Sequence, residues 1–275
     1  MRRAILLLTV VVTALVVASG VALAQVVNCP TGANGLCVGT DSADTLNGTS
    51  GDDDMRGLKG KDTLNAAAGF DLLSGGRGDD TLNGEGDNDT LNGGPNLDVL
   101  NGGAEDDTYV FVNGWGRDTI SDGTLGMFGE RLTFSLVTEP VTMDLVMSPS
   151  RPEAQSGTNR LNFVGAVSIG EVDGSSAGDT IRGQPDTDFL NGIQGSDTVN
   201  GRGGIDTVVG MEGNDTLTGG SGGDSFEAGP GADTIKAADN EADSIDCGGG
   251  NDTVFFDQGI DTFLNAAACE DKRPM

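Results

Sequence analysis

The sequence contains no histidine. Hydrolases that activate a serine or cysteine with an imidazole base are therefore excluded, and so are zinc sites that need histidine ligands.

Basic and aromatic residues are also scarce. Lysine and arginine total 15 against 43 acidic residues, so the formal net charge is −28, and only 4% of the 275 residues are aromatic. Such a charge opposes a compact fold by self-repulsion, and its sign makes nucleic acid and anionic membrane surfaces unsuitable partners. Of the acids 33 are Asp, and Gly reaches 46, so turns are expected rather than helices. Hard carboxylates favour calcium or magnesium as the neutralising partner.

The longest apolar run lies at the beginning of the chain. Arginines at positions 2 and 3 precede an apolar stretch over 4–17, and an Ala-x-Ala site ends at Ala24. This pattern predicts a signal peptide over 1–24 and hence a secreted, extracellular protein. An uncleaved anchor is the alternative, but the stretch is short for a membrane span. No later segment could cross a bilayer, so we expect no membrane span after cleavage.

Four cysteines in a secreted chain predict two disulfides, for which three connectivities are possible. Sequence spacing suggests two pairs, Cys29 with Cys37 and Cys247 with Cys269. These pairs would close an N-terminal segment over 25–38 and a C-terminal cap over 265–275. Zinc ligation would need a clustered quartet of thiolates, whereas the two pairs lie at opposite ends of the sequence.

A nine-residue period organises most of the chain. The segment 39–110 divides into eight consecutive units, and 174–264 holds ten more with one extra residue between the seventh and the eighth. The sixth position of every unit is Asp, and an apolar residue follows two positions later. Composition alone cannot place Asp at all eighteen positions. These lattice aspartates are Asp44, Asp53, Asp62, Asp71, Asp80, Asp89, Asp98, Asp107, Asp179, Asp188, Asp197, Asp206, Asp215, Asp224, Asp233, Asp243, Asp252 and Asp261.

The units resemble the Gly-Gly-x-Gly-x-Asp-x-U-x nonapeptide of RTX, or haemolysin-type, calcium-binding proteins, as in the stretch GGRGDDTLN over 75–83. The resemblance implies an all-β fold, a right-handed parallel β-roll solenoid in which two units make one 18-residue coil. It also implies that the lattice aspartates and main-chain carbonyls hold Ca²⁺ between the turns of successive coils.

The residue types suit that chemistry. Gly at the first, second and fourth positions predicts positive φ values there, and Asp adds the hard anionic oxygen that Ca²⁺ prefers. The eighth-position residues are expected to stack inward in columns, one of them formed by Leu46, Leu64, Leu82 and Leu100. The 18-residue spacing predicts one edge with Asp44, Asp62, Asp80 and Asp98, and another with Asp53, Asp71, Asp89 and Asp107. Eight and ten turns allow at most about 14 calcium ions between coils.

Several turns depart from the repeat, and we expect the weakest sites there. The fourth position is not Gly at Ser42, Asp87, Asn96, Glu105, Ala177, Asp186 and Glu241, and the first is Ala66, Ala228, Cys247 or Phe256. A purely structural use of Asp in Asx-turns is the alternative, but carboxylates stacked about 5 Å apart repel one another unless they are neutralised. Magnesium is disfavoured because flexible, carbonyl-rich cages suit the larger ion.

The period fails over 111–173. Alternating stretches at 141–145 and 161–164 predict strands, so we expect two repeat arrays separated by a non-repeat β segment. Two Gly-x-Ser-x-Gly matches, at 174–178 and 219–223, lie on the repeat lattice and have no histidine to activate the serine. We interpret them as products of composition.

These observations predict a secreted, non-catalytic calcium-binding β-roll that folds on extracellular Ca²⁺ and has a structural or adhesive role. Its further partner would be a cell-surface or matrix component. An extracellular polysaccharide lyase or epimerase, with its catalytic groups in 111–173 or on a roll face, is the first alternative. An ice- or surface-binding solenoid is the second, suggested by one ladder of seventh-position threonines, Thr180, Thr198, Thr216, Thr234 and Thr253.

Overall fold

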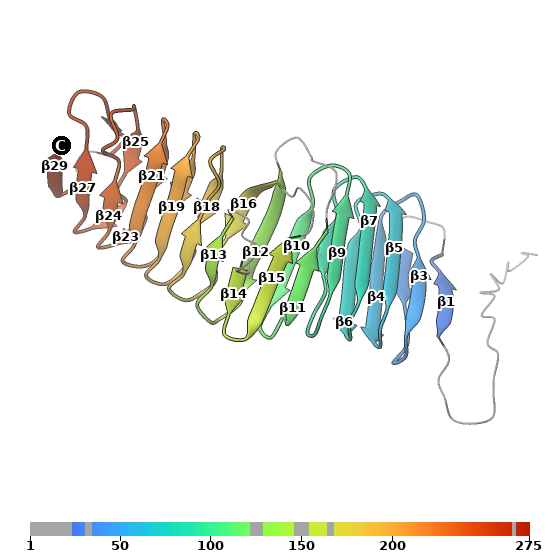
Figure 1. Ribbon diagram of the computed structural model, residues 1–275. Helices are drawn as coiled ribbons and strands as arrows, with labels where there is room; N and C mark the ends of the chain where they lie inside the picture. Colours follow the sequence, from blue (N-terminus) through green and yellow to red (C-terminus); the bar gives the residue numbers. More distant parts are fainter. Residues whose placement is uncertain (1–23, 31–34, 122–128, 146–153, 164–167, 266–267) are drawn as a thin grey trace, which may run out of the picture.

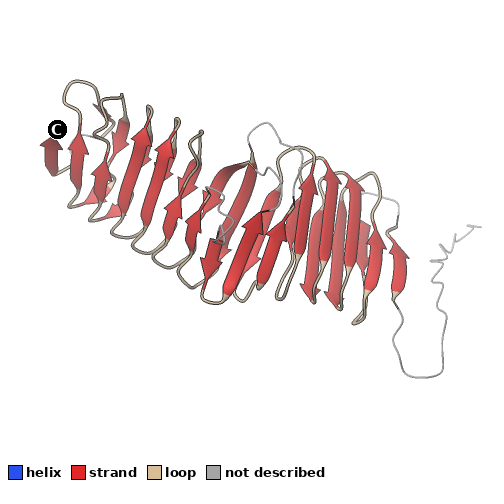
Figure 2. Cartoon of the chain, viewed as in Figure 1, coloured by secondary structure: helices blue, strands red, loops and turns tan. Residues whose placement is uncertain are grey.

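The computed structural model describes residues 24–30, 35–121, 129–145, 154–163, 168–265 and 268–275. The predicted signal peptide at 1–24 lies outside the described residues, except for Ala24. Within the described part the regular structure is all strand (Figure 2), and no helix there could span a membrane. The predicted all-β fold is confirmed.

Two long sheets run side by side along an elongated molecule (Figure 1). The first sheet has 15 strands, in the order β1 (Gln25–Asn28), β3 (Asp44–Asn47), β5 (Thr63–Ala68), β7 (Thr81–Gly86), β9 (Val99–Gly103), β11 (Arg117–Ile120), β15 (Asn159–Phe163), β14 (Ala154–Ser156), β13 (Thr142–Asp144), β17 (Thr180–Arg182), β19 (Thr198–Gly203), β21 (Thr216–Ser221), β24 (Thr234–Lys236), β27 (Thr253–Phe256) and β29 (Asp271–Pro274). The second has 12, in the order β2 (Gly35–Val38), β4 (Asp53–Lys59), β6 (Leu72–Arg77), β8 (Thr90–Asn92), β10 (Thr108–Val112), β12 (Glu130–Leu136), β16 (Ile169–Asp173), β18 (Phe189–Asn191), β20 (Thr207–Val209), β22 (Ser225–Glu227), β25 (Ser244–Asp246) and β28 (Thr262–Phe263). A two-stranded sheet joins β23 (Pro230–Gly231) to β26 (Gly249–Gly250).

In the arrays the chain crosses from one sheet to the other at each turn, so two units make one coil. The strands pair in parallel with a shift of 18 residues, which places the predicted column of Leu46, Leu64, Leu82 and Leu100 in register. All four side chains are fully buried. Burial of each such side chain stabilises the fold by about 1.5–3 kcal/mol relative to exposure. Outside the column, the Asn65 amide donates to Asn47 Oδ1 at 3.1 Å, so polar side chains also repeat along the sheet.

The segment between the arrays continues both sheets. On one side β12 and β16 carry the second sheet across the break, with register shifts at 110–112 and at 130–131. On the other side β14 pairs antiparallel with both β13 and β15, so the first sheet crosses the same region through a local reversal. The predicted non-repeat β segment therefore lies inside one continuous solenoid, which is parallel except at β14.

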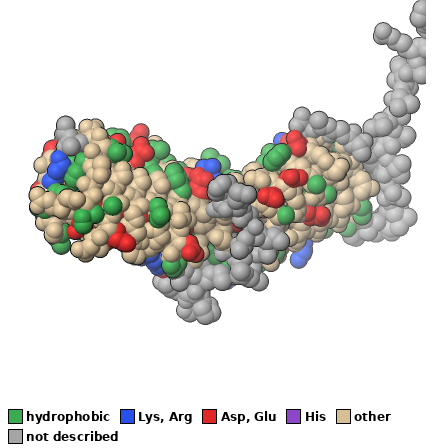
Figure 3. Space-filling view, turned by 90° about the horizontal axis from the view of Figure 1, so that it is seen from above, with side chains coloured by type: hydrophobic (Ala, Val, Ile, Leu, Met, Phe, Trp, Pro, Cys, Tyr) green, Lys and Arg blue, Asp and Glu red, His purple; other side chains and the backbone are tan. Residues whose placement is uncertain are grey.

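Disulfides close both ends. Cys29 bonds to Cys37 and Cys247 to Cys269, with Cα atoms 5.1 and 5.5 Å apart, so both predicted pairings are confirmed. The first links the strand regions at the N-terminal edges of the two sheets, because β1 and β2 are the first strands of each. On the face seen in Figure 3, acidic side chains are scattered over the surface and basic ones are few.

Candidate metal centres

The lattice aspartates form two hydrogen-bonded rows along the turns. Asp62 Oδ1 accepts a hydrogen bond from the Asp44 N–H at 2.7 Å, and the same bond links Asp80 to Asp62 and Asp98 to Asp80 at 2.8 Å. The other row joins Asp53, Asp71, Asp89 and Asp107 in the same way. The second array repeats both rows. The structure thus places the predicted residues along two edges, and successive aspartates on one edge are 18 or 19 residues apart in the sequence.

In most turns the second carboxylate oxygen has no donor. The Oδ2 atoms are buried and accept no hydrogen bond from the described residues at Asp62, Asp71, Asp80, Asp89, Asp98, Asp197, Asp206, Asp215, Asp224, Asp233 and Asp252. A buried, unpaired carboxylate oxygen is costly, because the desolvation of a charged group is not offset by any partner. These eleven turns therefore require a proton or a cation.

The pKa values carry the same message. Burial raises the pKa of Asp98 to about 7, opposed by the hydrogen bond from the Asp80 N–H and reinforced by the negative charge of Asp80. Burial likewise raises the pKa of Asp89 and of Asp197 to about 7. Desolvation by burial is the largest cause in each case, so the carboxylates resist ionisation unless a positive charge is present.

First-position glycines leave a small cradle beside eight of these eleven oxygens, those of Asp62, Asp80, Asp89, Asp98, Asp197, Asp206, Asp215 and Asp224. A Cβ atom on Gly57 would lie 2.5 Å from Asp62 Oδ2 and 2.5 Å from the carbonyl oxygen of Gly75 in the next coil. On Gly75 it would lie 2.6 Å from Asp80 Oδ2 and 2.7 Å from the Gly93 carbonyl oxygen. A side chain at this position would thus collide with two oxygens that face the same point.

The reason for the first-position glycine differs from the prediction. Positive φ values occur at the second and fourth positions, as in Gly76 at 102° and Gly78 at 148°, but not at the first. Gly57 and Gly75 are required for space and not for backbone conformation. The expectation of positive φ at all three positions was therefore wrong for the first.

The oxygens around the cradle fit calcium. Ca²⁺ takes six to eight oxygen ligands at about 2.3–2.6 Å, from carboxylates and main-chain carbonyls. The cradles at Gly57, Gly75, Gly84, Gly201 and Gly210 offer both kinds, from two successive coils. In the described ranges no three Asp, Glu or Cys side chains gather as a cluster, so carbonyls must supply much of any coordination shell. That composition suits calcium better than zinc, which prefers nitrogen and sulfur ligands.

Five lattice aspartates are instead closed by their own turn. Asp44 Oδ2 accepts the Thr40 N–H and hydroxyl, and Asp179 Oδ2 accepts the Ser175 N–H. The same local closure occurs at Asp53, Asp188 and Asp261. Four of these aspartates begin an array and the fifth ends one, so in the terminal turns Oδ2 has a donor from its own turn. The Oδ1 atoms of Asp53 and Asp188 are buried and accept no hydrogen bond from the described residues. The two remaining lattice aspartates are Asp107 and Asp243. Their Oδ1 atoms accept N–H groups from the preceding coil.

Two acids of the central segment extend the rows and were missed by sequence reasoning. Asp118 Oδ1 accepts the Asp98 N–H at 3.1 Å, and Glu130 Oε2 accepts the Asp107 N–H at 2.7 Å. Burial, followed by the charge of Asp98, raises the pKa of Asp118 to about 9. The stretch GWGRDTI over 114–120 has the spacing of a repeat unit and could have identified Asp118. It was hidden because Asp118 follows Asp107 by eleven residues instead of nine.

Comparison with known families matches this chain to the RTX calcium-binding nonapeptide repeat. The matched segments are 38–73, 67–99, 74–109, 173–208, 200–235 and 237–263, which together cover more than half of the chain. They coincide with the two arrays and leave the central segment unmatched. The search of curated proteins found no match to the chain.

Proposed function

Because the chain belongs to the RTX calcium-binding nonapeptide-repeat family, we propose that it is a secreted, non-catalytic protein that folds on extracellular Ca²⁺ and serves a structural or adhesive role. The observation that carries this proposal is the set of eleven buried carboxylate oxygens without a hydrogen-bond donor. Calcium would supply the positive charge that these oxygens need to remain ionised inside the fold. Extracellular calcium modules commonly bind at about 10⁻⁴ to 10⁻³ M, and sites of that affinity fill only outside the cell.

The turn over 75–80 shows how the residues would divide the task. Asp80 Oδ2 and the Gly93 carbonyl oxygen would hold the ion, and Gly75 leaves the space for it. Asp80 Oδ1 accepts the Asp62 N–H, which orients the carboxylate and joins the two coils. The same bond makes neighbouring sites cooperative, because ordering one turn positions the carboxylate of the next.

A pair of adjacent substitutions tests the assignment. Asp80→Asn keeps the size and the Oδ1 acceptor but removes the charge, whereas Asp79→Asn changes an exposed neighbour in the same turn. Calorimetric titration with calcium should show a loss of about one to two bound ions for Asp80→Asn and none for Asp79→Asn. Equal stoichiometry in the two variants would contradict the assignment of the sixth-position aspartates as ligands.

One observation favours the second candidate function, the binding of ice or another regular surface. Thr180, Thr198, Thr216, Thr234 and Thr253 pair in register along the first sheet, and the ladder extends to Thr142. Threonine also favours strands, so the ladder needs no function to explain it. Thermal hysteresis of the purified protein tests the idea, and its absence would end it.

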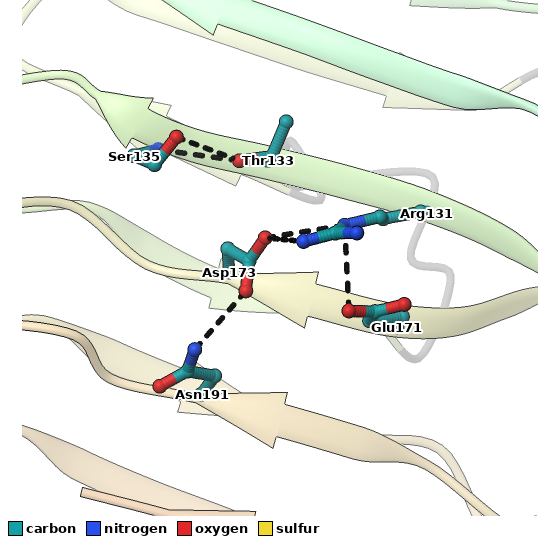
Figure 4. Close-up of polar contacts among 6 residues, drawn as sticks. All are labelled: Arg131, Thr133, Ser135, Glu171, Asp173 and Asn191. Atoms are coloured by element: carbon teal, nitrogen blue, oxygen red, sulfur yellow. Dashed lines mark hydrogen bonds and ion pairs between the residues drawn. The ribbon is translucent and has the colours of Figure 1, made fainter. Parts of the chain in front are cut away.

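No observation favours the lyase or epimerase alternative. The most polar cluster of the central segment joins Arg131 to Asp173 at 2.5 Å and to Glu171 at 3.4 Å, while Asn191 donates to Asp173 (Figure 4). The charges of these residues are paired with one another, and the cluster links β12, β16 and β18 across the second sheet.

A further inference from the structure

An open groove of about 450 Å³ lies on the outer side of the second sheet, in the first array. It crosses β4, β6 and β8 at the shoulder where these strands enter their turns, on the side opposite to the buried leucine column. Its lining includes Lys59 and Arg77 against a single acid, Asp41. The lining of the groove thus carries a net positive charge in a chain whose net charge is −28.

Two glycines, which have no side chain, create the hollow. Leu58 pairs in register with Gly76, and Gly94 follows Gly76 in the next coil, where a Cβ would collide with the Gly76 carbonyl. These two glycines therefore form a bare floor, and the side chains of Leu58 and Val112 stand at its two ends. Leu58 is 43% exposed, so it forms an apolar wall that no part of the described chain covers.

Three polar side chains in the groove have no partner within the described chain. Arg77, Ser74 and Asn92 line the groove, and none of them makes a side-chain hydrogen bond or ion pair. The contrast with the other sheet is clear, because Asn65 and Asn83 there bond to one another in a ladder at 2.9 Å. Only Lys59 is engaged, by Asp41 at 2.5 Å. A guanidinium, a hydroxyl and an amide thus remain available to one ligand.

The same face of the second sheet is different farther along the solenoid. There Arg131 is held by Asp173 and Glu171, and the remaining amide, that of Asn191, donates to Asp173 (Figure 4). Beyond this cluster the outward positions carry Glu227 and Asp246. An anionic ligand would be repelled there, whereas the groove offers it an unpaired cation.

We propose that the groove binds an acidic extracellular polysaccharide, with Arg77 bound to a uronate carboxylate and with Ser74 and Asn92 bound to sugar hydroxyls. Arginine binds carboxylates through two parallel hydrogen bonds, and the apolar wall at Leu58 suits the face of a sugar ring. An acidic peptide fits less well, because an extended peptide binds chiefly by adding a strand to a sheet edge. Strands β6 and β8 are paired on both sides, so the groove offers no such edge.

The test is a titration of a galacturonate hexasaccharide into the calcium-loaded protein at fixed free calcium. Binding should be saturable, and maltohexaose, which has six uncharged rings, should not bind. Arg77→Gln should weaken binding about tenfold through loss of a charged hydrogen bond, while Arg77→Lys should retain part of it. Arg273→Gln removes the same charge at the far end of the solenoid and should leave the affinity unchanged.

Three outcomes would overturn the proposal: equal binding of maltohexaose, wild-type affinity in Arg77→Gln, or tighter binding of hexaglutamate, which would assign the groove to acidic peptides. The proposal rests on the proposed calcium binding only through folding. Arg77 lies in the turn that Asp80 closes, so calcium bound there would order the turn that carries Arg77. If the protein is folded in EDTA, the hexasaccharide should bind there too, with the same loss in Arg77→Gln. Failure of calcium-driven folding and failure of saccharide binding are therefore distinguishable.

Discussion

The repeat arrays and the segment between them form the same kind of coil, but they differ in the side chains that the coils bury. In the arrays most strands bury a single side chain of the eighth repeat position, and the turns bury a row of carboxylates. In the central segment Phe111 stacks on Phe134 at 4.7 Å between ring centroids, and Trp115 packs edge-on against Phe111 at 4.9 Å. The arrays thus combine a core of single side-chain columns with rows of buried carboxylates, whereas the core of the central segment is made of packed aromatic rings.

This difference predicts where the fold depends on metal. The unpaired carboxylate oxygens lie in the arrays, whereas Arg131 supplies a positive charge to the acids of the central segment. The two regions nonetheless share their acidic rows, because Asp118 and Glu130 accept the last N–H groups of the first array. We therefore expect the two arrays to depend on calcium more strongly than the central segment that lies between them.

The largest expected effect is a loss of strand structure in the metal-free protein as the pH rises. The pKa of Asp98 rises from 3.8 to about 7 on folding, and those of Asp89 and Asp206 do the same. The folded state thus binds protons more tightly than the unfolded chain, so the stability is fully present below pH 3.8 and is lost as the pH rises through about 7. In EDTA, circular dichroism should show strand content falling between about pH 4 and 8. Strand content that rises over this window would contradict the expected dependence of the arrays on a cation.

Removal of the aromatic core of the central segment should have the next largest effect, on the free energy of unfolding. Trp115 is 1% exposed, so Trp115→Ala should lower the free energy of unfolding in saturating calcium by about 3–5 kcal/mol. Phe70→Ala is the matched control, because Phe70 is 66% exposed and should cost less than about 0.5 kcal/mol. Urea unfolding measures both. Equal losses in the two variants would show that the central segment contributes no core of its own.

The smallest effect tests the junction between the regions. Asp118→Asn removes the charge that follows Asp98 in its row, and it should weaken calcium binding at that turn about tenfold while the other turns keep their affinity. Asp186→Asn changes an exposed turn residue with no side-chain bond among the described residues and serves as the control. Isothermal titration compares them. Unchanged calcium affinity in Asp118→Asn would mean that the metal rows end at the array boundary.

The sequence predicts much of the arrays because their information is local and periodic. The nine-residue spacing, together with the RTX resemblance, predicts the 18-residue register, the leucine column and the two edges, and the cysteine spacing suggests the disulfide pairs. The central segment resists the same reasoning, because its insertions shift the register at Val110 and its strands include a reversal. Asp118 and Glu130 were missed for this reason.

Other features depend on contacts between coils that no single unit contains. The space beside Gly57 is set by a carbonyl 18 residues away, so its steric reason was not visible in the turn motif. The local closure of Asp44 by Thr40 separates a terminal turn from an inner one, although both carry the same Asp. The groove likewise requires Leu58, Gly76 and Gly94 to be neighbours, which follows only from the stacking.

Circular dichroism at neutral pH, recorded first in EDTA and then in millimolar calcium, tests the central claim most directly. The carboxylates of the arrays cannot all ionise inside the fold without a cation, so the protein should have little strand signal in EDTA and gain it cooperatively with calcium. Magnesium at the same concentration should not replace calcium. A chain that is already fully β-structured in EDTA, and unchanged by calcium, would contradict the account.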